Sequence, residues 1–172
     1  MSSQSFKSTL VSFRLVLCLF IFFLILSGVT AFPLVKELEL LTSMFGLDST
    51  STSPDGIGYW ILTVRDGLKD TYAKYPWMAY GTDWLAFAHI VIAIFFIGPF
   101  IDPVKNVWVL WAGLIACALI IPLALICGSI RHIPFGWQMI DCSFGILGAI
   151  PLCYCLSLTK KLSENGELAL PK

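Results

Sequence analysis

The chain has 172 residues, of which 58% are hydrophobic and 13% charged, and its formal net charge is zero. A soluble domain carries about twice that charged fraction, and a water-soluble fold of this length could not bury so much apolar surface. We therefore expect a single membrane domain over residues 1–172 with lipid as a partner, and the lack of a basic run excludes a nucleic-acid partner.

Four apolar segments are long enough to cross a hydrocarbon core of about 30 Å, which needs about 20 helical residues. They cover residues 10–31, 84–101, 107–130 and 137–158. Short links join the last three, which favours antiparallel neighbours. The predicted fold class is all-α, an integral membrane four-helix bundle.

The first segment has two interpretations. Its basic start, its apolar run and the small residues Val29-Thr30-Ala31 also resemble a secretory signal with a cleavage site. However, the run is longer than the roughly 7–15 apolar residues of such signals, and Arg14 can extend its charge to the inner interface. We favour a retained transmembrane helix and keep the cleaved signal as the alternative.

The connection of residues 32–80 also has helical patterning. Apolar side chains recur at helical spacing from Leu34 to Phe45, and a second stripe runs from Ile57 to Tyr72. Charged residues fall on the other faces of both stretches. We predict two amphipathic helices in this outer connection, lying on the bilayer or covering the bundle.

Aromatic residues are dense in and after the second stripe, as is typical of segments at the level of lipid headgroups. They are Tyr59, Trp60, Tyr72, Tyr75, Trp77, Tyr80 and Trp84. Tyr75-Pro76 should end the second amphipathic helix, because a residue before proline is pushed out of the α region.

The distribution of basic residues favours an N-terminus and a C-terminus in the cytoplasm, since short cytoplasmic flanks are enriched in Lys and Arg. With that orientation the inner flanks hold Lys7, Arg14, Lys105, Lys160, Lys161 and Lys172. The basic residues of the outer side are mostly spread along the connection between the first two segments, which also carries most of the acids.

Polar residues converge near the outer ends of the second and fourth segments. Helical rise places His89 about 9 Å beyond Asp83 and Asp141 about 6 Å beyond residue 137, so the two side chains should lie at similar depths. We predict a buried ligand-binding or polar cluster of His89, Asp141 and Gln138, covered by Asp83 and Arg131. Ionisable groups inside a bilayer often mark a functional site, but such pairs also act as packing contacts between helices.

Small residues recur four apart in the third and fourth segments, at 113 and 117, at 124 and 128, and at 145 and 149. Such pairs let membrane helices approach closely. These faces are therefore expected to point into the bundle.

Cofactor and catalytic hypotheses find little support. A haem held by His89 and His132 would be strained, since the two lie some two helical turns apart. Cys127 and Cys142 could approach each other, but the chain has no Cys-x-x-Cys motif. Metal, nucleotide and hydrolase motifs are absent. We expect no cofactor and no metal, and an enzymatic activity is an unsupported alternative.

Residues 80–89 (YGTDWLAFAH) and 131–145 (RHIPFGWQMIDCSFG) resemble a group of small bacterial inner-membrane proteins of unknown function with four predicted transmembrane helices. The resemblance covers the last three segments, about half of the chain. It implies a location in the bacterial inner membrane, with the periplasm on the outer side. It implies no mechanism.

Three functions follow as hypotheses. The first is a non-enzymatic membrane protein that binds a ligand, lipid or protein partner through its outer half. The second is a small oligomeric transporter or channel with a proton or ion path through His89 and Asp141, which needs self-association because four helices rarely enclose a pore. The third is an accessory subunit that contacts a larger membrane complex through Trp108 and Trp111.

Overall fold

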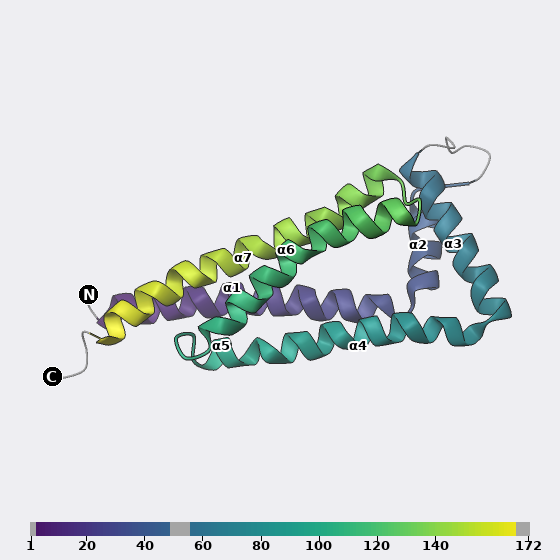
Figure 1. Ribbon diagram of the computed structural model, residues 1–172. Helices are drawn as coiled ribbons and strands as arrows, with labels where there is room; N and C mark the ends of the chain where they lie inside the picture. The colour runs from purple at the N-terminus through teal and green to yellow at the C-terminus, as the bar shows by residue number, and fades with distance from the viewer. Residues whose placement is uncertain (1–2, 49–55, 168–172) are drawn as a thin grey trace. The chain divides into compact units, whose positions relative to one another are not determined.

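The computed structural model describes residues 3–48 and 56–167, which are helical with no strand. In chain order the elements are α1 (Ser3–Ala31), α2 (Leu34–Met44), α3 (Ile57–Lys74), the short 3₁₀ helix η1 (Pro76–Met78), α4 (Ala79–Phe95), α5 (Ile97–Ile101), α6 (Val107–Ile130) and α7 (Phe135–Glu167) (Figure 1). The predicted all-α class is confirmed.

Four helical stretches in the described part of the chain are long and apolar enough to cross a membrane. They are Gln4–Ala31, Pro76–Ile101, Val107–Ile130 and Phe135–Glu164. The third agrees with its predicted bounds, whereas the second begins well before residue 84. The polar stretch Gly81-Thr82-Asp83 interrupts the apolar run there but not the backbone hydrogen bonding of the helix.

Contacts along the chain divide it into two units. One contains residues 1–24 and 92–172 and is called the bundle unit below; the other contains residues 25–91 and is called the hairpin unit. That both units act as one membrane domain stays a prediction.

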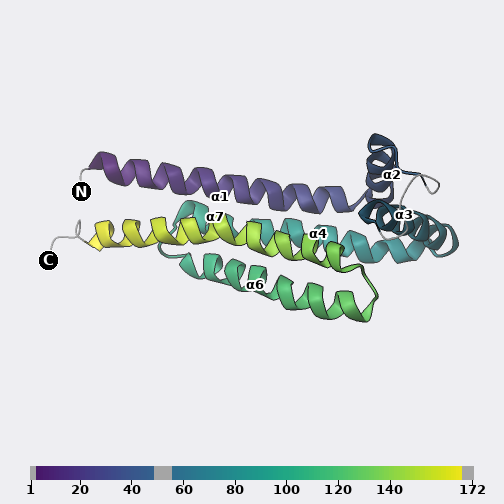
Figure 2. The ribbon, with the colours of Figure 1, turned by 90° about the horizontal axis from the view of Figure 1, so that it is seen from above.

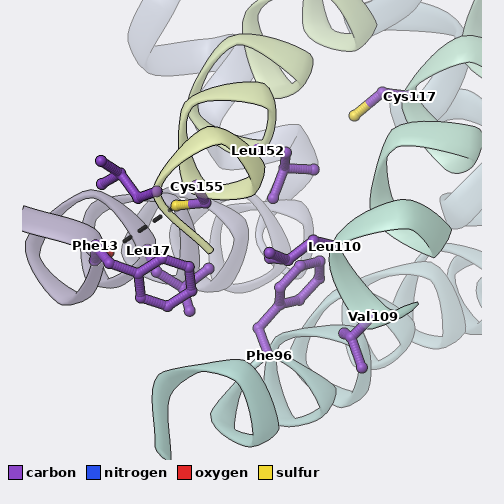
Figure 3. Close-up of a cluster of buried hydrophobic side chains, with 9 residues drawn as sticks. Phe13, Leu17, Phe96, Val109, Leu110, Cys117, Leu152 and Cys155 are labelled. Atoms are coloured by element: carbon purple, nitrogen blue, oxygen red, sulfur yellow. Dashed lines mark hydrogen bonds between the residues drawn. The ribbon is translucent and has the colours of Figure 1, made fainter. Parts of the chain in front are cut away.

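The bundle unit has a continuous apolar core. In both ribbon views α6 and α7 lie side by side (Figures 1 and 2), and α1 contributes side chains to the same core (Figure 3). Its buried members are Phe13, Leu17, Phe96, Val109, Leu110, Cys117, Leu152, Cys155 and Leu158. The rings of Phe20 and Phe96 pack edge to face beside it, with centroids 4.9 Å apart.

Glycines set the spacing between helices of this unit. A Cβ atom on Gly145 of α7 would lie 2.5 Å from the backbone oxygen of Cys117 on α6, so no larger residue fits without moving a helix. Gly113 is enclosed by the side chains of Phe96 and Leu152 in the same way. Both glycines belong to the small-residue pairs that the sequence places on inward faces.

Arg14 of α1 links two helices of the bundle unit. Its Nε donates to the carbonyl of Phe100 over 3.1 Å and its Nη2 to that of Ile101 over 3.4 Å, while the guanidinium lies 5.5 Å from the centre of the Phe100 ring. The last carbonyls of a helix lack partners within it. Arg14 therefore supplies hydrogen-bond donors to the last carbonyls of α5, in addition to any extension of its charge toward the membrane interface.

The hairpin unit contains α2 and α3, which pack side by side in an antiparallel pair (Figures 1 and 2). Leu38 and Thr42 of α2 are buried, as are Ile61 and Leu62 of α3. As predicted, α3 ends just before Pro76: its last residue is Lys74, and the cap residue Tyr75 leaves the helical region with φ −135° and ψ 70°.

Candidate functional site

His89 lies on α4 in the hairpin unit and is partly buried. Its Nδ1 is 2.8 Å from the carbonyl oxygen of Leu85, one turn earlier. Because a carbonyl oxygen only accepts, Nδ1 carries the proton, and Nε2 of the neutral ring is left as an acceptor. Gly28 of α1 packs against the same turn, since a Cβ there would lie 2.9 Å from Cβ of His89.

The polar residues that precede His89 join α4 to α3. The Thr82 hydroxyl donates to the carbonyl of Ala79 over 2.7 Å, and its oxygen lies 3.5 Å from the hydroxyl of Tyr72 on α3. Asp83, the next residue, is partly buried. Thr82 therefore has a structural role at the start of α4, and Asp83 lies less than two turns from His89.

Gln138 closes the turn between α6 and α7 in the bundle unit. It is 5% exposed, and its Nε2 donates to the carbonyl of Ile133 over 2.7 Å. Its side chain covers Gly128, where a Cβ would lie 2.7 Å from it. The amide group of Gln138 is thus used by the turn, which sequence reasoning did not anticipate.

His132 occupies the turn itself in a left-handed conformation, with φ 56°. The Ile133 amide donates to Gly128 over 2.9 Å and the His132 amide to Ser129 over 3.3 Å. These two bonds form a Schellman motif, in which the position of His132 is usually glycine. His132 is exposed, so its place in the structure is set by its backbone.

The structure divides the predicted cluster between the two units. His89 and Asp83 belong to the hairpin unit, whereas Gln138, Asp141 and Arg131 belong to the bundle unit. Asp141 is partly buried and Arg131 is exposed. The predicted contact between His89 and Asp141 stays a prediction.

A second polar network, between α2 and α3, was missed by sequence reasoning. Nη1 of Arg65 donates to the Thr42 hydroxyl over 3.1 Å, and Nε of Arg65 pairs with Asp66 over 2.7 Å. One turn further along, Lys69 forms an ion pair with Glu39. A signal was present, because Arg65 follows the buried Ile61 by four residues and so shares its helix face.

Electrostatics agree with this pairing. The hydrogen bond from Lys69 holds the pKa of Glu39 below its ordinary value, and that from Arg65 does the same for the pKa of Asp66. Burial raises the pKa of Glu37, on another face of α2. Both carboxylates of the network are therefore charged at neutral pH and neutralise the two basic side chains.

Beside this network is a shallow, open depression at the end of α2. It is lined by Glu39, Thr42, Ser43, Gly46, Leu47 and Arg65, together with Asp48. Gly46 has φ 58°, and the Leu47 amide donates to Thr42 over 2.9 Å, so this helix also ends in a Schellman motif.

Side chains suited to metal or thiol chemistry do not gather in the residues that the structure describes. No group of three His, Cys, Asp or Glu side chains is arranged there to hold a metal ion. All six cysteines are free, with Cys142 buried and Cys127 exposed.

No family model matches the chain, and no curated protein or solved structure matches it either. The class of protein therefore follows from the fold. The four long apolar helices in residues 3–48 and 56–167 indicate a multi-pass membrane protein.

Proposed function

We propose that this chain is a non-enzymatic protein of the bacterial inner membrane that binds a ligand, lipid or protein partner through its outer, periplasmic half. The observation that carries the proposal is the ion-paired contact between α2 and α3. The other spans are joined by links of a few residues, 102–106 and 131–134. A connection of more than forty residues with its own packed polar contacts does more than join two helices.

The orientation rests on basic residues. Lys7, Arg14, Lys105 and Lys160 flank the ends of spans on the side that holds both termini, as expected of the cytoplasmic side. The connection between α1 and α4 then faces the periplasm. We include in the proposal that α1 is retained, because Phe13 and Leu17 are part of the core of the bundle unit.

We further propose that α2 and α3 act as amphipathic helices at the outer membrane interface. Met44 is 71% exposed and Phe45 68% exposed at the end of α2, and Leu40, one turn before Met44, is 62% exposed. Exposed apolar side chains of this size favour a membrane surface or a partner.

Native mass spectrometry of the full-length protein in mild detergent tests the binding function. We expect a specific co-purifying species whose retention falls at least tenfold in Arg65→Met, which removes the guanidinium but keeps the apolar stem. Lys74→Met, at the exposed end of α3, serves as the matched control. A wild-type protein that retains nothing above the control detergent background would refute the proposal.

The same experiment distinguishes the accessory-subunit hypothesis from binding through the outer half. A protein partner that still co-purifies with Arg65→Met, but does not co-purify with the double variant Trp108→Ala and Trp111→Ala, would instead favour contact through α6. Both indoles are exposed on that helix.

A second candidate is an oligomeric transporter with a proton path through His89 and Asp141. The observation in its favour is the bond from Nδ1 of His89 to Leu85, which leaves Nε2 able to take up a proton. Proteoliposomes loaded with a pH indicator test it: His89→Ala and Asp141→Asn should each abolish a flux that His132→Ala keeps. If vesicles that contain the wild-type protein show no more proton flux than vesicles without protein, the transporter hypothesis is excluded.

A further inference from the structure

One end of the bundle unit carries an excess of basic side chains. The start of α1 and the end of α7 lie at this end in both ribbon views (Figures 1 and 2), and Arg14 joins the end of α5 to it. The basic residues on the described elements here are Lys7, Arg14, Lys105, Lys160 and Lys161, and the acidic residues are Asp102, Glu164 and Glu167. At the other end of the unit, Arg131 is balanced by Asp141.

Two of these lysines lie at the same level of the bundle. The Cys155 thiol donates to the backbone oxygen of Phe13 over 3.9 Å, which sets the register of the antiparallel helices α7 and α1. Lys7 precedes Phe13 by six residues, about 9 Å along a helix, and Lys160 follows Cys155 by five, about 7.5 Å. Lys7 and Lys160 therefore lie on the same side of the Phe13–Cys155 contact, at nearly equal distances from it along their helices.

The same two lysines are available for binding. Arg14 is occupied by the carbonyls at the end of α5, and Lys105 pairs with Asp102 over 3.4 Å. Lys7 and Lys160 are exposed, and neither forms an ion pair with a side chain that the structure describes.

The helix that carries Lys160 remains packed to this level. Leu158 and Leu162 are buried on either side of it, next to the core of the unit. Lys160 is therefore held on a packed helix, and Lys7 lies within α1.

We propose that Lys7 and Lys160 form a docking surface for the phosphate groups of anionic phospholipids in the leaflet at this end of the bundle. Neither lysine forms an ion pair with a described side chain, and each lies three or four residues inside the end of a candidate membrane span, Gln4–Ala31 for Lys7 and Phe135–Glu164 for Lys160. A lysine so near the end of a span can extend its ammonium group to the headgroup layer. Basic residues beside a span attract anionic headgroups within a Debye length.

The test is lipid retention by the full-length protein in mixed micelles of phosphatidylglycerol and phosphatidylcholine, followed by native mass spectrometry. Wild type should retain phosphatidylglycerol preferentially, and the double variant Lys7→Gln and Lys160→Gln should lose that preference by roughly fivefold for each lysine. Lys7→Arg with Lys160→Arg should keep it. The matched control Lys36→Gln with Lys74→Gln changes the same charge in the hairpin unit and should also keep it.

Three results would overturn the proposal: no preference in wild type, an unchanged preference in the double glutamine variant, or an equal loss in the control. Inorganic phosphate provides a further arm. Displacement of the lipid by millimolar phosphate would point to a soluble anion instead of a membrane surface, because a single free phosphate lacks the apolar anchoring of a phospholipid.

Discussion

The bundle unit and the α2–α3 contact of the hairpin unit handle polar groups in opposite ways. In the bundle unit, Arg14 and Gln138 donate to backbone carbonyls, and helices approach through glycines. In the hairpin unit, Arg65 and Lys69 pair with side-chain carboxylates. Hydrocarbon offers no partner for a free carbonyl, whereas water screens ion pairs and makes them weak. The bundle unit should therefore depend on shape, and the hairpin unit on pH and salt.

The largest effect expected from this contrast is at Gly145. Gly145→Leu forces α7 away from the backbone of Cys117 and should destabilise the bundle unit by about 3 kcal/mol or more. Unfolding by SDS in mixed micelles measures it. Gly136→Leu, on the same helix but in open space, should cost much less; equal losses in the two variants would show that helix spacing is not the cause.

The second effect concerns Arg14. Arg14→Leu leaves the carbonyls of Phe100 and Ile101 without their donor and should cost about 1–3 kcal/mol. Arg14→Lys should recover only part, because an ammonium lacks the fork that reaches both oxygens. The same unfolding assay applies. A stability that is indifferent to both changes would argue that α1 has been removed from the mature protein.

A smaller, stabilising effect is expected at the α6–α7 turn. His132→Gly removes the cost of a left-handed non-glycine residue, about 1 kcal/mol. The bundle unit should gain that stability in the micelle assay, with His132→Ala as the control that keeps the strain. No gain would mean that the imidazole stabilises the turn by contacts of its own.

The smallest effect tests the hairpin unit. The pKa of Glu39 is lowered on folding, so its contribution to stability is present above the ordinary value of 4.5 and is lost as the pH falls through the lowered folded value. The protection of the α2 and α3 amides, measured by hydrogen exchange relative to the intrinsic exchange rate at each pH, should therefore fall at acidic pH and at high salt.

The control for that measurement is Glu39→Gln, which should flatten this part of the pH dependence. Burial raises the pKa of Glu37, so protonation of Glu37 acts in the opposite direction, and the difference between wild type and the variant isolates Glu39. The protection of the α6 and α7 amides, corrected for the intrinsic exchange rate in the same way, should stay constant. If amide protection in the bundle unit depended on pH as strongly as in the hairpin unit, the proposed contrast between the two units would be wrong.

Much of the fold could be predicted, because the relevant signals are local. Apolar runs located all four spans, since crossing a hydrocarbon layer requires a minimum length of apolar helix. The end of α3 at Lys74, with Tyr75 as its cap, followed from the steric effect of Pro76 on the residue before it. The candidate site was harder to predict from the sequence. Its residues were chosen because they lie at similar depths in the membrane, and similar depth does not determine which side chain a polar group contacts.

The sequence alone thus determined which stretches of the described chain are long and apolar enough to cross a membrane and which residues lie near the ends of each. Only the tertiary structure decided the partners of Arg14, Gln138 and Arg65, which are a helix end, a turn carbonyl and a buried hydroxyl. Those contacts depend on the rotation and register of packed helices. Both are set by the shapes of many side chains at once, such as the close fit at Gly145, and no single segment encodes them.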